Sequence, residues 1–273
     1  TRPYAGYEDI IADVDAVSIA VPTSQHAEVA LAFIRKGVHC LIEKPIARTM
    51  EEAQLIMEEA QKRAVKLMVG HVERFNPAVT AVKEVLNGGT LGRIAMISTR
   101  RAGPFPPRIK DVGVVLDLAT HDIDVVRYLL GREPLTLFAR EGSCNHISQD
   151  YAAIFLDFGN PVACIEVNWL TPHKVRTLTV TGSQGIAYVD YIKQELTVHN
   201  TTGQTIPYVN REEPLKRELQ HFIDCIENDK EPLVSGYDAA QVLGIALQAT
   251  AHAQRDDDKN DRSERTTPVC AHR

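Results

Sequence analysis

The segments AVSIAVPT, residues 16–23, and VHCLIEKP, residues 38–45, decide the fold of this chain. Each contains an apolar run that is closed by a proline within a few residues, which is typical of a buried parallel strand. Residues 23–36 between them have the pattern of a helix, and a third apolar run follows at residues 66–69. Strands that alternate with helices of this length predict βαβ units and a parallel α/β sheet over residues 1–75.

The pattern changes after residue 75. Turn signals separate short apolar strands between residues 135 and 199, and helices are predicted on either side of them. This spacing predicts an α+β domain over residues 76–254, with one open, mostly antiparallel sheet and a last helix that packs back on the first domain. Residues 255–273 are highly charged and nearly without apolar side chains, so we expect a disordered tail.

Composition argues against several classes of protein. The 273 residues carry a net charge of −6, whereas general nucleic-acid binders more often have a basic domain or stripe. No apolar run approaches the roughly 18 residues of a membrane span. The five cysteines are scattered and form no CxxC pair, so neither a disulfide framework nor a zinc site is indicated. We therefore expect a protein of the reducing cytoplasm with neither a nucleic acid nor a membrane as its partner.

Lys44 is the most informative single residue. It stands just beyond the carboxyl end of an apolar strand and is followed by Pro45, and ligands of open α/β sheets bind at this edge. One interpretation is a solvated surface lysine beside a turn. The other, favoured by the apolar strand, is a cation that faces a cofactor or substrate, where it can stabilise a developing alkoxide or have its pKa lowered by burial.

A second group of ionisable residues lies on a largely apolar predicted helix, residues 114–130. Asp117 and His121 are four residues apart and share a helical face, with Asp124 near it. Ionisable side chains on a buried helix are costly unless they are paired or functional. A carboxylate one turn from a histidine suits a general base at neutral pH, but a structural pair that ties helix to sheet explains the pattern equally well.

Other polar positions are weaker candidates. Arg74 follows the third strand and could bind a phosphate or carboxylate in bidentate fashion, whereas Asn76 is better explained as the N-cap of a helix that begins at Pro77. Asn168 and Trp169 end a strand of the second domain. The tryptophan either packs in the core or stacks on a sugar or base.

Several sequence motifs together carry a resemblance to a known family. They are residues 14–23, His26, residues 37–39, Glu43-Lys44-Pro45, and Asp117 with His121. The combination resembles the Gfo/Idh/MocA family of NAD(P)-dependent oxidoreductases over roughly residues 4–253. Residues 70–78 and 112–130 are most similar to the branch that acts on nucleotide sugars, the UDP-N-acetylglucosamine 3-dehydrogenases.

The resemblance implies a reaction and roles for residues. The reaction is oxidation of a secondary hydroxyl of a sugar or nucleotide sugar by hydride transfer to nicotinamide. Lys44 would lie between nicotinamide and substrate and assist proton transfer, His121 would be the general base, and Asp117 would orient the substrate or His121. Asn168 is implied to contact the sugar. The residues implied to line NAD or NADP are Ala20, Val21, Pro22, Thr23, His26, Glu43, Lys44 and Arg74.

One part of the family pattern is missing. No two glycines are separated by a single residue, so a G-x-G-x-x-G loop, on which the pyrophosphate normally sits, occurs nowhere. We therefore expect a partial Rossmann sheet without its first βαβ unit, an N-terminal truncation, and no measurable NAD binding by this chain. The alternative function is an inactive remnant that only binds sugar or assembles through its open sheet, for which we expect a homo-oligomer.

Overall fold

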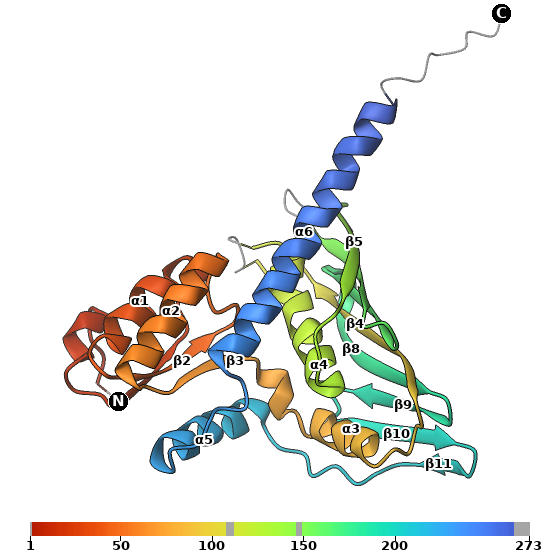
Figure 1. Cartoon of the computed structure of the whole chain (residues 1–273), viewed down its shortest axis with the longest axis horizontal. Coiled ribbons are helices and arrows are strands. Elements are labelled where there is room, and N and C mark those ends of the chain that lie inside the picture. Colours follow the sequence, from red (N-terminus) through yellow and green to blue (C-terminus); the bar gives the residue numbers. More distant parts are fainter. Residues whose placement is uncertain (1, 108–111, 146–148, 265–273) are drawn as a thin grey trace, which may run out of the picture.

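The computed structural model describes residues 2–107, 112–145 and 149–264. A small parallel sheet with its helices lies beside a larger sheet, and the long helix α6 runs between them (Figure 1). The elements of the first part are η1 (Tyr7–Ile10), β1 (Ala16–Ile19), η2 (Thr23–Gln25), α1 (His26–Ile34), β2 (His39–Glu43), α2 (Met50–Arg63), β3 (Leu67–Gly70) and η3 (Val72–Phe75).

The first sheet has the order β1-β2-β3 and is parallel throughout, which confirms the predicted α/β class. Its register aligns Ile19 with Ile42, and Glu43 with Gly70. The carboxyl ends of the three strands therefore form one edge, and Lys44 emerges from the middle strand at that edge.

The second sheet has the order β11-β10-β9-β8-β4-β7-β6-β5. Its strands are β4 (Ile94–Pro104), β5 (Thr136–Gly142), β6 (Tyr151–Asp157), β7 (Val162–Asn168), β8 (Leu170–Gly182), β9 (Gly185–Asp190), β10 (Glu195–Asn200) and β11 (Gly203–Thr205). All neighbours pair in antiparallel fashion except β4 and β7, which are parallel. The predicted open, mostly antiparallel sheet is thus confirmed, but the sequence did not indicate β4, which lies at its centre.

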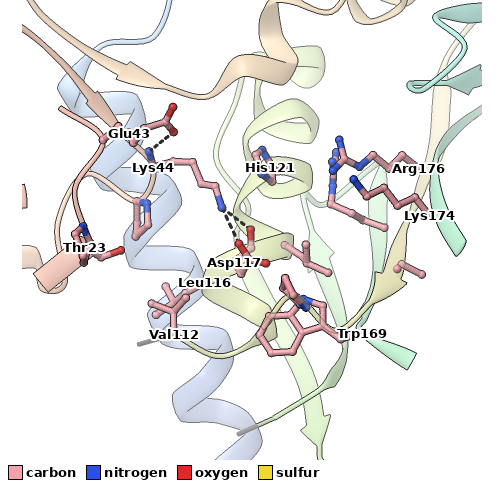
Figure 2. Close-up of a pocket in the computed structure, with 18 of the residues that line it drawn as sticks. Thr23, Glu43, Lys44, Val112, Leu116, Asp117, His121, Trp169, Lys174 and Arg176 are labelled. Atoms are coloured by element: carbon pink, nitrogen blue, oxygen red, sulfur yellow. Dashed lines mark hydrogen bonds and ion pairs between the residues drawn. The ribbon is translucent and has the colours of Figure 1, made fainter. Parts of the chain in front are cut away.

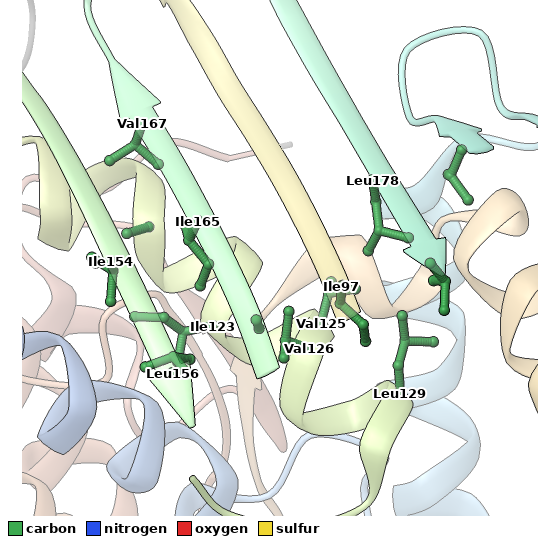
Figure 3. Close-up of a cluster of buried hydrophobic side chains, with 14 of the residues drawn as sticks. Ile97, Ile123, Val125, Val126, Leu129, Ile154, Leu156, Ile165, Val167 and Leu178 are labelled. Atoms are coloured by element: carbon green, nitrogen blue, oxygen red, sulfur yellow. The ribbon is translucent and has the colours of Figure 1, made fainter. Parts of the chain in front are cut away.

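Helices cover one face of this larger sheet (Figure 1). They are α3 (Pro77–Asn87), the π-helical turn η4 (Val115–Ala119), α4 (Thr120–Leu130) and α6 (Gly236–Glu264), whereas α5 (Pro214–Glu227) packs with the first core through Phe222. As predicted, Asn76 is the N-cap of α3, and its side chain accepts a hydrogen bond from the Ala78 amide. Figure 3 shows apolar side chains of α4 packed against those of the strands, including Ile123 and Val126 beside Ile154 and Ile165. Burial of each such side chain contributes roughly 1.5–3 kcal/mol, so α4 is held firmly on the sheet.

Helix α6 belongs to both cores. Ala240 and Leu243 pack with the first sheet, whereas Ala246 and Ala249 pack with the second. The helix starts close to β3, because a Cβ on Gly236 would lie only 2.8 Å from a methyl carbon of Leu67.

The helix also continues to Glu264, so residues 255–264 are helical where the sequence predicted a disordered tail. Extending an existing helix adds one hydrogen bond per residue without a new nucleation cost. The rest of that predicted tail lies outside the described residues. None of the helices in the described ranges is long and apolar enough to cross a membrane.

Candidate active site

A cavity of about 680 Å³ opens at the carboxyl edge of the small sheet, between the two domains. The first domain contributes the segment after β1 and the residues after β2, while η4, α4, β4 and β8 form the opposite wall (Figure 2). Residues that line the cavity include Ala20, Val21, Pro22, Thr23, His26, Glu43, Lys44, Arg101, Asp117, His121, Trp169, Lys174 and Arg176.

Lys44 crosses the cavity and contacts Asp117 of the other domain. Its Nζ donates to the Asp117 carbonyl oxygen at 2.6 Å and to Oδ1 at 3.3 Å, and both side chains are mostly buried. Burial lowers the pKa of Lys44, whereas the Asp117 carboxylate opposes that shift. Asp117 lies in a π-helical turn, a distortion that is frequent at functional sites. The interpretation of Lys44 as a solvated surface lysine is therefore wrong.

His121 lies one turn beyond Asp117 and also lines the cavity. Its pKa is held well below the ordinary value of 6.5, first by burial and then by the charges of Lys44 and Arg101. The ring is therefore neutral at physiological pH and can accept a proton. Its Nδ1 is buried and has no hydrogen-bond partner among the described residues. Asp117 thus contacts Lys44, and the prediction that it orients His121 finds no support in these contacts.

The first-domain wall combines small apolar residues with polar ones. Residues 20–23 follow β1, and His26 holds this segment beside Lys44, since Nδ1 lies 2.8 Å from the Pro45 carbonyl oxygen and Nε2 lies 3.0 Å from that of Val21. Glu43 accepts a hydrogen bond from the Lys44 amide at 3.3 Å. Small apolar residues beside a cation at the carboxyl end of parallel strands fit a nicotinamide ring. The wall thus suits the cofactor that the sequence suggests.

Arg74 does not join the cavity. Its guanidinium forms a fork with Asp124, with Nε to Oδ2 at 2.8 Å and Nη2 to Oδ1 at 2.7 Å, and Nη1 donates to the Leu233 carbonyl oxygen. Arg74 and Asp124 are 4% and 1% exposed. The predicted cofactor contact of Arg74 is at odds with this arrangement, because its donors are already used inside the protein.

Asn168 is also absent from the cavity lining. Its side chain contacts Glu166 and the Leu170 amide, which fixes the end of β7. Trp169 does line the cavity, and its ring meets Phe105 edge-on at 5.4 Å between centroids. Its indole Nε1 is buried without a partner in the described ranges, so the tryptophan packs against the protein and still presents a face to the cavity.

Three basic residues of the cavity were missed from the sequence. Arg101 on β4 is buried and bonds to Asp122 at 2.9 Å and to Glu73 at 2.9 Å. Lys174 and Arg176 belong to β8. A strand signal was present, since residues 94–99 are rich in apolar and β-branched side chains, but the paired arginines that follow it conceal a buried strand.

Two family models match the chain. Residues 1–71 match the NAD-binding Rossmann fold of an oxidoreductase family, and residues 79–188 match the GFO/IDH/MocA C-terminal domain. The UDP-N-acetylglucosamine 3-dehydrogenase of Acidithiobacillus ferrooxidans is 30% identical over 90% of this chain and 81% of its own length. Inositol 2-dehydrogenase 2 of Saccharopolyspora erythraea is 38% identical over 85% of this chain and 69% of its own.

Solved structures agree with these matches. A crystal form of the Acidithiobacillus ferrooxidans enzyme superposes with a TM-score of 0.86 at 29% identity, over 93% of this chain and 83% of that one. A levoglucosan dehydrogenase solved with NADH and levoglucosan superposes at 0.84 over 93% and 82%, and at 23% identity it supports the fold alone. The fold, the cavity and these relatives lead to one assignment: the chain belongs to the Gfo/Idh/MocA family of NAD-dependent oxidoreductases.

Proposed function

We propose that this protein oxidises a secondary hydroxyl of a sugar or nucleotide sugar, with NAD as hydride acceptor and with Lys44 and His121 as the groups that handle the proton. The observation that carries the proposal is the contact of Lys44 with Asp117, at 2.6 Å and 3.3 Å, beside a neutral His121 in one cavity. The nucleotide-sugar substrate is supported by the similarity to a UDP-N-acetylglucosamine 3-dehydrogenase.

His121 acts as the general base in this proposal. Its lowered pKa keeps the imidazole neutral at pH 7, and a neutral imidazole can take the proton of the substrate hydroxyl as the carbonyl forms. Positioned bases of this kind contribute roughly 10²–10⁴-fold to a rate. The buried position of the ring also shields the transferred proton from bulk water.

Lys44 stabilises the oxygen that carries charge during the reaction. Asp117 holds the ammonium group in place, and its two contacts oppose the loss of the Lys44 proton that burial favours. A fixed cation in a water-poor cavity stabilises a developing alkoxide more strongly than the same cation in bulk solvent. Asp117 is thus a positioning residue for Lys44.

NAD supplies the electrophilic ring that accepts the hydride when it is bound. The residues that would hold it are Ala20, Val21, Pro22, Thr23, His26 and Glu43, all on the first-domain wall. Lys44 would then face both cofactor and substrate from the same edge of the sheet. Arg74 takes no part in this proposal, because Asp124 occupies its guanidinium.

The proposal is tested by mixing the purified protein with NAD and a panel of sugars and nucleotide sugars, and by following NADH through its absorbance. We expect NADH to form with at least one member, at a rate proportional to protein concentration, and this result would overturn the expectation, drawn from the missing G-x-G-x-x-G loop, that the chain does not bind NAD. A matched reaction with the Lys193→Ala variant, altered at an exposed lysine in the turn after β9, should proceed unchanged. Absence of NADH with every member would contradict the proposal and favour a sugar-binding remnant.

We further propose that two copies associate through the uncovered face of the larger sheet. Met96, Tyr151, Phe155 and Tyr188 are 38–46% exposed, and they lie on three different strands of that sheet, β4, β6 and β9. An apolar face of this kind is typical of an interaction surface. Sedimentation of the wild type should give a dimer or larger species, and Phe155→Lys should shift it towards the monomer; a wild-type monomer at high concentration would rule this out.

A further inference from the structure

Lys174 and Arg176 form the β8 wall of the cavity and have no part in the chemistry proposed above. Figure 2 shows both side chains on the side of His121 away from Lys44. Lys174 lies where the register between β4 and β8 shifts, between the pairs Ala102–Val175 and Pro104–Leu170. Bulges of this kind redirect side chains, often next to active sites. The stem of Lys174 runs over Gly103, whose ideal Cβ would lie 3.6 Å from the lysine Cγ.

Arg176 stands directly opposite Arg101 in the register of β8 and β4. Like charges in opposite positions of neighbouring strands destabilise a sheet, so the placement calls for a compensating anion. Arg101 has two: Asp122 and Glu73, each at 2.9 Å. Among the residues that the structure describes, Arg176 has a single anionic partner, Glu73, which lies 3.6 Å from its Nη1 and is shared with Arg101. The surrounding carboxylates therefore compensate the charge of Arg101 well and the charge of Arg176 poorly.

The electrostatics of the cavity agree with this imbalance. Burial and then the charge of Arg101 lower the pKa of Arg176, which is the direction for a cation in a cation-rich environment. Arg176 in turn is among the charges that lower the pKa of His121. Lys174 is exposed and has no ion-pair partner among the residues that the structure describes. The two side chains thus leave positive charge uncompensated on one wall.

We infer that Lys174 and Arg176 form a subsite for an anionic group of the sugar substrate, a carboxylate or a phosphate ester. Arginine recognises either group through paired N–H donors, and lysine adds a compact point charge. An anion in this position would compensate the positive charge of Lys174 and Arg176 that Glu73 alone does not neutralise. The inference rests on the proposed sugar oxidation and narrows its substrate class from sugars in general to acidic ones.

The subsite also fixes how the substrate enters. A sugar anchored by its anionic group on β8 presents its ring towards His121 on the same wall and Lys44 beyond it (Figure 2). Anchoring a remote group in this way orients the reacting hydroxyl without taking part in the chemistry. Lys174 and Arg176 are therefore specificity-determining residues, and they should affect KM far more than kcat.

The experiment measures binding by titration calorimetry, which requires no turnover. The ligands are N-acetylglucosamine as the neutral sugar, glucuronate as the carboxylate, UDP-N-acetylglucosamine as the diphosphate, and uridine as the control for the base. The proteins are wild type, Lys174→Gln, Arg176→Gln and the double variant. Lys193→Gln, which makes the same change outside the cavity, is the matched control.

We expect the wild type to bind an acidic ligand at least about tenfold more tightly than N-acetylglucosamine, the scale of one charge-assisted hydrogen bond. Each single variant should lose about that factor for the acidic ligand and none for the neutral one, and Lys174→Arg should retain it. The tighter of glucuronate and UDP-N-acetylglucosamine identifies the anion. Equal affinity for neutral and acidic ligands, or a preference that survives in the double variant, would overturn the inference.

The outcome is separable from that of the proposed function. Selective binding of an acidic ligand without NADH formation from any sugar would leave the subsite intact and refute the oxidation. Oxidation of a neutral sugar, without tighter binding of acidic ligands, would support the proposed oxidation and refute the subsite.

Discussion

The interior and the cavity use the same basic and acidic residue types in opposite ways. Inside the protein, Arg74 and Asp124 form a fork with short contacts, and both are almost completely buried. In the cavity, Lys44 reaches the Asp117 carboxylate only at 3.3 Å, and His121 leaves Nδ1 without a partner in the described part of the chain. The interior pair is thus closed by short contacts on both sides, whereas Lys44 and His121 keep bonding capacity for a ligand.

The largest expected effect lies in the cavity. Lys44→Ala and His121→Ala should each lower kcat by about 10²–10⁴-fold, because one loses the stabilising cation and the other the base. Neither change should lower the thermal midpoint by more than a few degrees. Steady-state kinetics and thermal unfolding of the same samples check the two parts. Turnover near that of wild type in both variants would remove these residues from the mechanism.

Substitution in the interior pair of Arg74 and Asp124 should lower the stability of the fold. Arg74→Met leaves Asp124 buried without a partner and should cost about 3–5 kcal/mol of unfolding free energy. The control is Arg48→Met, which breaks the exposed pair with Glu52 and should cost roughly 0.5 kcal/mol or less. Denaturant titrations of both variants provide the measurement. A loss for Arg74→Met no greater than that of the control would show that the interior pair is not structural.

Glu218 is a third case, because it is a buried carboxyl group that forms no ion pair with any residue that the structure describes. Neither of its oxygens has a hydrogen-bond partner in the described ranges, and burial, followed by the charge of Glu43, raises its pKa to about 8 from 4.5. A folded-state pKa raised in this way contributes stability below pH 4.5 that is lost as the pH rises through about 8.

Glu218→Gln removes that dependence. It should raise the unfolding free energy relative to wild type by about 4–5 kcal/mol near pH 9 and by less than about 1 kcal/mol near pH 5. Urea titrations at the two pH values make the test. Equal effects at both would mean that the glutamate does not titrate as its burial implies.

The smallest expected effect concerns the electrostatic coupling between Lys44 and His121 in the cavity. The charge of Lys44 is, after burial, the main cause of the lowered pKa of His121, so Lys44→Ala should move that pKa upwards. In wild type the base stays neutral, so kcat/KM should stay level from neutral pH down to well below 6.5. An NMR titration of the histidine ring protons compares the two proteins. An unchanged His121 titration in Lys44→Ala would show that the two groups are not coupled.

Local sequence patterns were enough to predict the first sheet and to single out the three catalytic candidates. The apolar runs closed by proline lead directly to β1 and β2, and Lys44 follows from its place at the end of β2. The four-residue spacing likewise put Asp117 and His121 on one side of a helix, and both line the cavity although Asp117 lies in a π-helical turn.

Pairing between distant strands could not be predicted in the same way. Arg74 and Arg101 look alike as basic residues in the sequence, yet Arg74 meets Asp124 inside the protein and Arg101 lines the cavity. Lys174 and Arg176 reach the cavity only because β8 lies against β4 with a shifted register. Such contacts are properties of the assembled sheet, and no short stretch of the chain contains them.

The shared helix α6 has a consequence for how the substrate range of this protein can change. Because Ala240 packs into the first core and Ala246 into the second, the helix sets the spacing between the wall that carries Lys44 and the wall that carries His121. A larger side chain at either alanine would push the walls apart without altering any residue that touches a ligand. Adaptation to bulkier sugars therefore has a route through positions that an inspection of the cavity alone would overlook.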